Sequence, residues 1–217
     1  MSPALSPARK LLRTWKNLGA PIHAGTVLAL GPGGFDLARA AQDVLEPGAL
    51  TLVHPDPAPP RARFKTTSDS LTELAATRPG AFDLVLAAGG LGAASIGGVR
   101  DDLGHMVALL APEGVLALVI DTLGAPDAGG GIDTLLFPHL HRQGDLGDEP
   151  RTLLPAAAWM LLFKAMGLDV QAAEGLGTQE IAPETFARHA ARLEIYDSVE
   201  LATGRLHVIA RQRGDRP

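Results

Sequence analysis

Short apolar runs alternate with segments of helical periodicity along most of the chain. The run at 115–120 is apolar at every position, which is typical of a strand covered on both faces of a sheet. Strands that alternate with helices predict an α/β fold, with a doubly wound, mostly parallel sheet and helices on both faces. The predicted strands are 27–30, 50–53, 64–66, 84–88, 115–120, 169–173 and 206–210, and the predicted helices are 5–18, 35–45, 70–77, 99–110, 155–166 and 183–191.

Two segments depart from this alternation. Residues 121–150 are rich in Gly and Asp, and a connection of this length is often a lid or a binding loop, so we expect a long insert there. Near the end of the chain, alternating apolar and polar residues predict a β-hairpin that turns at "ATGR", residues 202–205. No change of composition marks a second domain, so we expect one domain over 1–217, with its first helix within 1–20.

The ends of two helices carry further signals. Ser68 or Asp69 is expected to cap the helix at 70–77, because their side-chain oxygens can accept a backbone N–H. In the helix at 155–166, one face carries large apolar side chains, for which core packing or a subunit contact is a better interpretation than a substrate pocket. These side chains are Trp159, Leu162, Phe163 and Met166.

Composition and charge argue against a nucleic-acid partner. The formal net charge is −5 and aromatic residues make up 4% of the chain, whereas nucleic-acid binders normally carry a basic stripe or an aromatic stacking platform. The exception is a short basic stretch, which we interpret as the solvated face of the first helix. A membrane or partner contact is the alternative. The stretch holds Arg9, Lys10, Arg13 and Lys16.

Features that the chain lacks exclude further kinds of site and further classes of protein. The chain has no cysteine, which excludes disulfides, thiolate zinc sites and cysteine nucleophiles. It has no apolar run long enough to span a membrane and no secretory signal pattern. We therefore expect a soluble, cytoplasmic protein. A homodimer or a protein partner is left open.

Glycines crowd the segment "TVLALGPGGFDLARA", between the first strand and the next helix. Gly31, Gly33 and Gly34 carry no Cβ, so a ligand can approach the backbone, and free amides at a helix start favour polar or anionic groups. The dinucleotide fingerprint fails because Asp36 stands where a glycine is needed. A P-loop fails too, since no Lys-Ser or Lys-Thr follows.

Three motifs in order resemble the class I S-adenosylmethionine-dependent methyltransferases: the glycine segment above, "FDLVLAAGGLG" and "LLAPEGVLALVI". Pro112 and Gly114 fit the L-x-P-x-G pattern that opens the family's fifth strand. The resemblance covers about residues 26–120 and, more loosely, the chain through 212. It implies a seven-stranded sheet whose last strand is antiparallel and lies beside strand five. It also implies S-adenosylmethionine as the cofactor.

The resemblance implies a set of cofactor-binding positions. By analogy, Asp69 approaches the adenine amine. The position that usually holds a ribose-binding acidic residue falls on His54, and Asp56, two residues on, is the nearest carboxylate. A neutral imidazole accepts one hydrogen bond and cannot match a bidentate carboxylate, so the loss is about 1.5–3 kcal/mol, or roughly ten- to a hundredfold in affinity. The remaining positions are Gly31, Gly33 and Gly34 in the loop, and Ala88, Gly89 and Gly90 beside the sulfonium.

The glycine loop differs from the family's usual pattern at two further positions. The family often has Asp before the loop and a third loop glycine, and here these positions are Ala29 and Phe35. Both an active methyltransferase with atypical ribose contacts and a domain that has lost the cofactor are compatible with this pattern.

Candidate general bases come from the end of strand five and from the insert: Asp121, His139 and His141. His139 and His141 could also share a metal with an aspartate, but no third ligand is fixed by spacing, so we expect solvated histidines and no metal site.

We therefore expect S-adenosylmethionine-dependent methyl transfer to a small-molecule substrate. The alternative is a non-catalytic methyltransferase-fold subunit that serves assembly or a protein partner. A nucleotide-sugar or NAD-dependent enzyme ranks third.

Overall fold

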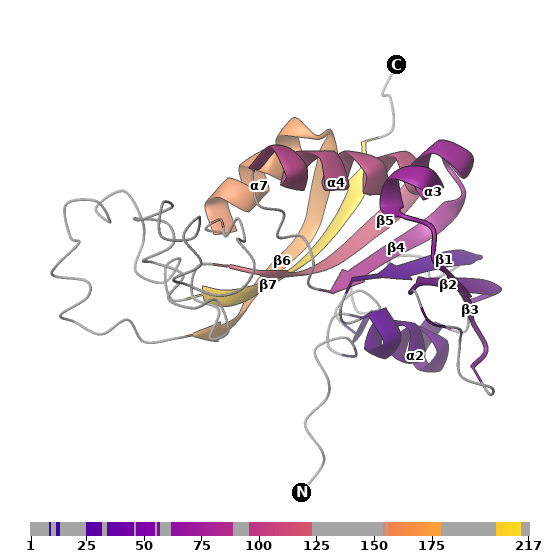
Figure 1. Cartoon of the computed structure of the whole chain (residues 1–217). Helices are drawn as coiled ribbons and strands as arrows, with labels where there is room; N and C mark the ends of the chain where they lie inside the picture. Colours follow the sequence, from indigo (N-terminus) through magenta and orange to yellow (C-terminus); the bar gives the residue numbers. More distant parts are fainter. Residues whose placement is uncertain are drawn as a thin grey trace, which may run out of the picture.

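In the computed structural model, the described residues are 9, 12–13, 25–31, 34–45, 47–54, 56, 62–88, 96–122, 154, 156–178 and 203–213. They form a sheet with helices on both faces (Figure 1). The strands are β1 (Thr26–Leu30), β2 (Ala49–Val53), β3 (Lys65–Thr67), β4 (Phe82–Ala88), β5 (Leu110–Asp121), β6 (Leu168–Thr178) and β7 (Thr203–Gln212). The helices are α2 (Gly34–Leu45), α3 (Leu71–Thr77), α4 (Ile96–Leu109) and α7 (Ala156–Ala165).

The seven strands lie in the order β3-β2-β1-β4-β5-β7-β6. The pairs from β3 to β5 are parallel, whereas β7 is antiparallel to both of its neighbours, β5 and β6. This confirms the predicted fold class, including the antiparallel last strand beside β5.

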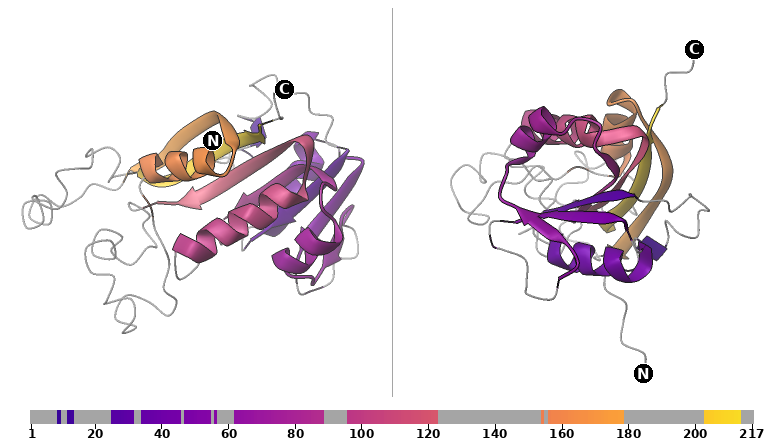
Figure 2. Two further views of the ribbon diagram at one scale, coloured as in Figure 1. Left: turned by 90° about the horizontal axis from the view of Figure 1, so that it is seen from above. Right: turned by 90° about the vertical axis from the view of Figure 1, so that its right-hand side faces the viewer.

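Helices cover the sheet unequally. α2 lies on one face, and α3, α4 and α7 lie on the other (Figure 1, Figure 2). Side chains of β5 alternate between the two cores: Ala117 packs on the α2 side, and Leu116 and Leu118 pack on the opposite side. Because both faces are covered, a strand in this position has to be apolar throughout, which explains the continuous apolar run.

The first helix is described at three positions only, residues 9, 12 and 13, which are helical. Leu12 is fully buried in the core on the α2 side. Arg9 forms an ion pair of 2.5 Å with Asp43 of α2, so this member of the basic stretch faces the protein's own acidic residue. No helix among the described residues has the length and apolar character needed to cross a membrane.

The large apolar side chains of α7 belong to the core. Trp159 and Phe163 are fully buried and stack at 5.9 Å between ring centroids. Leu162 and Met166 pack partly buried against them. Core packing, one of the two predicted interpretations, is confirmed for these residues.

The predicted turn at "ATGR" is wrong for the described residues 203–205, which belong to β7. Arg205 pairs with Asp121 of β5, and Thr203 pairs with Thr178 of β6. Partners on both sides hold this stretch extended, and neither partner is visible in the local sequence. The predicted helix at 183–191 and most of the insert, residues 123–150, lie outside the described residues.

The connection before β5 also differs from prediction. β5 begins at Leu110, directly after α4, and not at Val115. Leu110 pairs with Phe82 and Val115 pairs with Leu84, so the strand carries a bulge between these two pairs. Glu113 has a positive φ of 64° within it. A Cβ on Gly114 would lie 2.8 Å from the carbonyl oxygen of Ala111, which explains the glycine of the L-x-P-x-G motif.

We predict that Gly114→Ala lowers the free energy of unfolding by roughly 1–3 kcal/mol, because the backbone of the bulge has to shift. Gly104→Ala is the matched control: its Cβ would lie at an ordinary 3.6 Å from Met166 Cε, inside α4, where alanine is favoured over glycine by about 0.5–1 kcal/mol. Urea unfolding of both variants checks this. Equal effects of the two substitutions would contradict the packing explanation.

Candidate cofactor site at the carboxyl edge of the sheet

The strand register brings predicted site residues from four adjacent strands to one edge of the sheet. Ala29 pairs with Leu52, and Leu30 pairs with Ala87. The residues that follow, Gly31, His54 and Ala88, therefore lie at the carboxyl ends of adjacent strands. Asp69 follows β3, whose last residue pairs with the last residue of β2. In doubly wound sheets, ligands bind beyond this edge.

The glycine loop begins with a tight turn. Gly31 has a φ of 90°, which an L side chain rarely adopts. The N–H of Gly34 donates to the carbonyl oxygen of Gly31 at 2.8 Å, so the chain reverses directly from β1 into α2. Gly31 therefore places backbone without a side chain at the position predicted for ligand contact. Gly33, Gly89 and Gly90 lie outside the described residues.

Gly34 has a packing role. A Cβ there would lie 2.7 Å from Cδ1 of Leu52, so the glycine lets α2 approach β2 closely. The same requirement explains the third glycine of dinucleotide-binding loops. A direct contact between Gly34 and a cofactor stays a prediction.

His54 has its hydrogen-bond acceptor engaged. Its Nδ1 accepts the backbone N–H of Asp56 at 3.0 Å. A nitrogen that accepts carries no proton, so the neutral ring carries its proton on Nε2 and presents a donor there. While this bond holds, His54 cannot accept a hydrogen bond from a ribose hydroxyl. The Asp56 side chain is 81% exposed, and its Oδ2 lies 3.9 Å from Nδ1 of His54.

An aromatic contact holds the His54 ring from the α2 side. The rings of Phe35 and His54 meet edge to face, with centroids 4.3 Å apart. Phe35 also meets Phe64 in the same manner at 6.1 Å. Phe35 stands at the third glycine position of the family's loop. Here its ring lies against the residue at the position of the usual ribose-binding carboxylate.

Asp69 is anchored by a neighbouring threonine. The hydroxyl of Thr67 donates to Asp69 Oδ2 at 2.7 Å, and the Asp69 N–H lies 3.3 Å from the Thr67 Oγ1. The Thr67 carbonyl accepts the N–H of His54 at 2.9 Å. Thr67 therefore links the two predicted cofactor residues His54 and Asp69.

The helix after Asp69 is capped by Ser70, and the predicted cap at Ser68 or Asp69 is wrong. Ser70 Oγ accepts the N–H of Glu73, and the Ser70 N–H donates to Glu73 Oε2 at 2.7 Å. This reciprocal capping box needs Glu three residues after the cap, a spacing that singles out Ser70. The hydrogen bonds from the Ser70 backbone and hydroxyl lower the pKa of Glu73.

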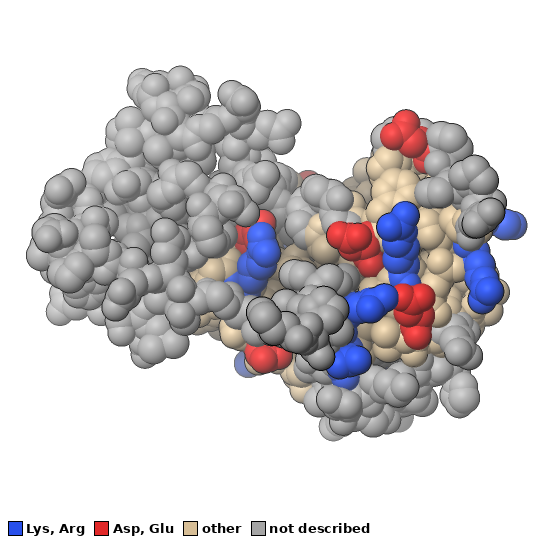
Figure 3. Space-filling view, turned by 90° about the horizontal axis from the view of Figure 1, so that it is seen from below, with Lys and Arg blue, Asp and Glu red and all other residues tan. Residues whose placement is uncertain are grey.

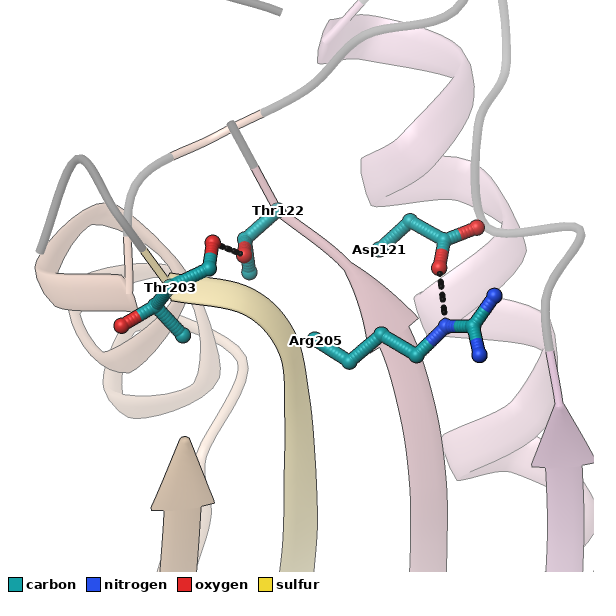
Figure 4. Close-up of polar contacts among 4 residues, drawn as sticks. All are labelled: Asp121, Thr122, Thr203 and Arg205. Carbon is teal, nitrogen blue, oxygen red and sulfur yellow. Dashed lines mark hydrogen bonds and ion pairs between the residues drawn. The ribbon is translucent and has the colours of Figure 1, made fainter. Parts of the chain in front are cut away.

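The far end of the edge carries a charged pair. Arg205 Nε donates to Asp121 Oδ1 at 3.0 Å, and beside it the Thr122 hydroxyl donates to the carbonyl of Thr203 (Figure 4). Asp121 thus joins β5 to β7, in addition to its predicted role as a base, which stays a prediction. The other two candidate bases, His139 and His141, lie outside the described residues.

Three of the described residues at this edge are aspartates, whereas the described part of the α2 face is mixed. Asp56, Asp69 and Asp121 all lie at the carboxyl ends of strands or just beyond them. On the face that carries α2, the described acidic and basic side chains are interspersed (Figure 3). The described part of that face carries no single-sign basic patch.

Sequence comparisons identify no relatives. No protein-family model matches the chain, and no curated protein matches it. Solved structures do match. The chain is similar to a methyltransferase dependent on S-adenosylmethionine from Mesorhizobium loti, with 14% identity over 95% of this chain and 99% of that one, and a TM-score of 0.56.

Two further matches carry information on ligands and partners. One is the Burkholderia thailandensis 1,6-didemethyltoxoflavin-N1-methyltransferase with bound 1,6-didemethyltoxoflavin and S-adenosylhomocysteine (16% identity, 95% and 77% coverage, TM-score 0.53). The other comes from the complex between the Haloferax volcanii Trm112 methyltransferase activator and a methyltransferase (16% identity, 94% and 90% coverage, TM-score 0.59). The fold of this chain is therefore the class I methyltransferase fold.

Sequence reasoning missed three participants at this edge. Arg205 falls in the predicted turn at "ATGR". Extending the predicted antiparallel last strand back to this residue would have paired it with Asp121 of β5. Thr67 gave no signal beyond its place in a strand. The contact between Phe35 and His54 joins residues 19 positions apart on different elements, and periodicity does not report such contacts.

We predict that Glu73→Gln destabilises the protein at neutral pH but not in acid. Because the pKa of Glu73 is lowered in the folded state, its stabilising effect is present above its ordinary value of 4.5 and is lost as the pH falls through the lower folded value. Urea unfolding at pH 7 and pH 3 measures this, with Asp101→Asn on α4 as a control for net charge. A difference between wild type and Glu73→Gln that is the same at both pH values would contradict it.

Proposed function

We propose that this chain transfers the methyl group of S-adenosylmethionine to a small-molecule acceptor. The proposal rests mainly on the turn at Gly31. This turn lies at the carboxyl edge of a sheet with the class I methyltransferase fold, and Ala88 lies on the adjacent strand. Small side chains at these two points leave the backbone accessible to a ligand. The matched solved structures support the same cofactor class.

The described residues fit the cofactor in part. The Asp69 carboxylate can accept from an adenine amine, and carboxylates at this edge suit a sulfonium cation better than a pyrophosphate. This favours S-adenosylmethionine over NAD or a nucleotide sugar. The ribose contact fits poorly at His54, because its Nδ1 already accepts the Asp56 N–H. Asp56, exposed and two residues on, is the carboxylate that we assign to one ribose hydroxyl, so the second acceptor of the usual bidentate contact is missing.

S-adenosylmethionine supplies a methyl group already activated by the positive sulfur. The protein's task is then to align the acceptor, exclude water and remove a proton where the acceptor carries one. We assign proton removal to Asp121, His139 or His141. Asp121 is the one whose surroundings are described, and Arg205 holds one of its oxygens at 3.0 Å.

A non-catalytic subunit is the second candidate, and a specific observation favours it. Phe35 and Asp56 both contact His54, so the side chain at the usual ribose-binding position already has partners within the chain. The Haloferax volcanii match comes from a complex with an activator protein. On this alternative, the domain serves assembly with a partner or with a second copy of itself.

Calorimetry with S-adenosylmethionine and S-adenosylhomocysteine, together with native mass spectrometry of the purified protein, tests the proposal. We expect binding of both compounds and a co-purified ligand of matching mass. No heat and no thermal shift at millimolar ligand would overturn the enzymatic assignment and favour the non-catalytic subunit.

We predict that His54→Asp binds S-adenosylhomocysteine roughly ten- to a hundredfold more tightly than wild type. The carboxylate restores two acceptors for the ribose diol. His54→Asn is the matched control, because it has the same shape but a single acceptor oxygen and no charge. Calorimetry on the three proteins measures the difference. Equal affinities would mean that residue 54 does not contact the ribose.

A further inference from the structure

A groove lies at the opposite edge of the sheet from the candidate cofactor site. It has a volume of about 600 Å³ and is lined by the first residues of four strands: Thr26 of β1, Ala49 of β2, Lys65 of β3 and Phe82 of β4. These are the amino ends of the strands, whereas the candidate cofactor site lies at their carboxyl ends. Clefts of 300–1,000 Å³ commonly hold small molecules.

Among the described lining residues, the charged ones are all cations. They are Arg63, Lys65 and Arg78, and none of the described residues that line the groove is an aspartate or glutamate. The whole chain carries 24 acidic against 19 basic residues, so this local excess runs against the protein's overall charge. Such a concentration of one sign raises the local concentration of counter-ions.

The three cations converge from two separate elements. Lys65 is the first residue of β3, Arg63 lies two residues before it, and Arg78 is the C-cap residue of α3. All three side chains are exposed. Within the described part of the chain, no carboxylate forms an ion pair with any of them.

Asp83, a described carboxylate that follows the lining residue Phe82, is already engaged. Asp83 Oδ2 accepts both the backbone N–H and the hydroxyl of Thr26, at 2.8 and 2.9 Å. It therefore fastens the start of β1 and does not neutralise the cations.

The groove also has apolar walls. Phe64 and Phe82 contribute to the lining, although they are only 7% and 4% exposed. Leu50 and Ala49 add aliphatic surface between them. A ligand that fills this groove would place a carbon skeleton against the walls and its charged groups against the cations.

Each cation taken alone has a simpler explanation. β3 is an edge strand, and charged residues on an edge strand disfavour pairing with other chains. Arg78, at a helix C-terminus, complements the helix dipole. Neither explanation accounts for three cations from two elements lining one groove with no carboxylate among its described lining residues.

We propose that this groove binds a small organic anion with two or more negative charges, carried on phosphate or carboxylate groups. Two charges are needed because the cations approach from β3 on one side and from α3 on the other. Arginine favours such groups, since its planar guanidinium donates two parallel hydrogen bonds to one phosphate or carboxylate. The proposal stands independently of methyl transfer.

Titration of the full chain with tripolyphosphate and with citrate, followed by ¹H–¹⁵N NMR, tests it. We expect the amide signals of Thr26, Ala49 and Lys65 to shift with a sub-millimolar dissociation constant, while those of Gly31 and His54 stay in place. The anion that binds more tightly identifies phosphate or carboxylate as the preferred group. Added salt should weaken binding.

Arg63→Gln/Arg78→Gln should weaken binding about tenfold, because two charge-assisted contacts are removed. The matched control is Arg39→Gln/Arg100→Gln, which removes two exposed arginines of α2 and α4 and should change affinity less than about twofold. Thermal melts of all variants confirm that they fold. The proposal is overturned if neither anion shifts the amino-edge amides at about 10 mM, or if both double variants weaken binding equally.

Discussion

Burial of β5 on both faces is the interaction on which the rest of the sheet depends. Its residues from Val115 to Ile120 are at most 6% exposed, and burying each Val, Leu or Ile contributes roughly 1.5–3 kcal/mol. β5 also pairs on both edges, with β4 in parallel and with β7 in antiparallel. It therefore joins the parallel half of the sheet to the antiparallel pair β7 and β6, and it contributes side chains to both cores.

The register that follows from this arrangement decides what meets at the carboxyl edge. Parallel pairing of β1 with β2 and β4 places Gly31 between His54 and Ala88. Antiparallel pairing of β7 with β5 carries Arg205 back to Asp121. In both cases, backbone hydrogen bonds between the strands decide which residues meet at the edge. The side chains at the edge take no part in this pairing, so they can change while the sheet stays the same.

The two ends of the strands offer opposite chemistry. Carboxylates gather at the carboxyl edge, where a positively charged sulfonium compound would lie. Cations line the groove at the amino edge, where we place an anion. At the carboxyl edge, His54 shows how one residue changes a site without changing the fold. The ring keeps its place in the strand, but its acceptor nitrogen serves Asp56, so it offers a ligand a donor where a carboxylate would offer acceptors.

By itself, the sequence determined the order of the elements, the two-sided burial of β5, the glycine turn and the fold class. These features are local: apolar periodicity and glycine placement record which faces are buried and where the backbone reverses. The tertiary structure alone decided that residues 203–205 are strand, that Ser70 and not Asp69 caps α3, and that Arg205 holds Asp121. It also decided that Arg63, Lys65 and Arg78 share one groove. Arg205 and Asp121, like the three cations of the groove, come from separate elements, and a pattern along the chain does not specify which elements meet. Ser68, Asp69 and Ser70 are neighbours that could each cap α3, and residue type alone does not choose between them.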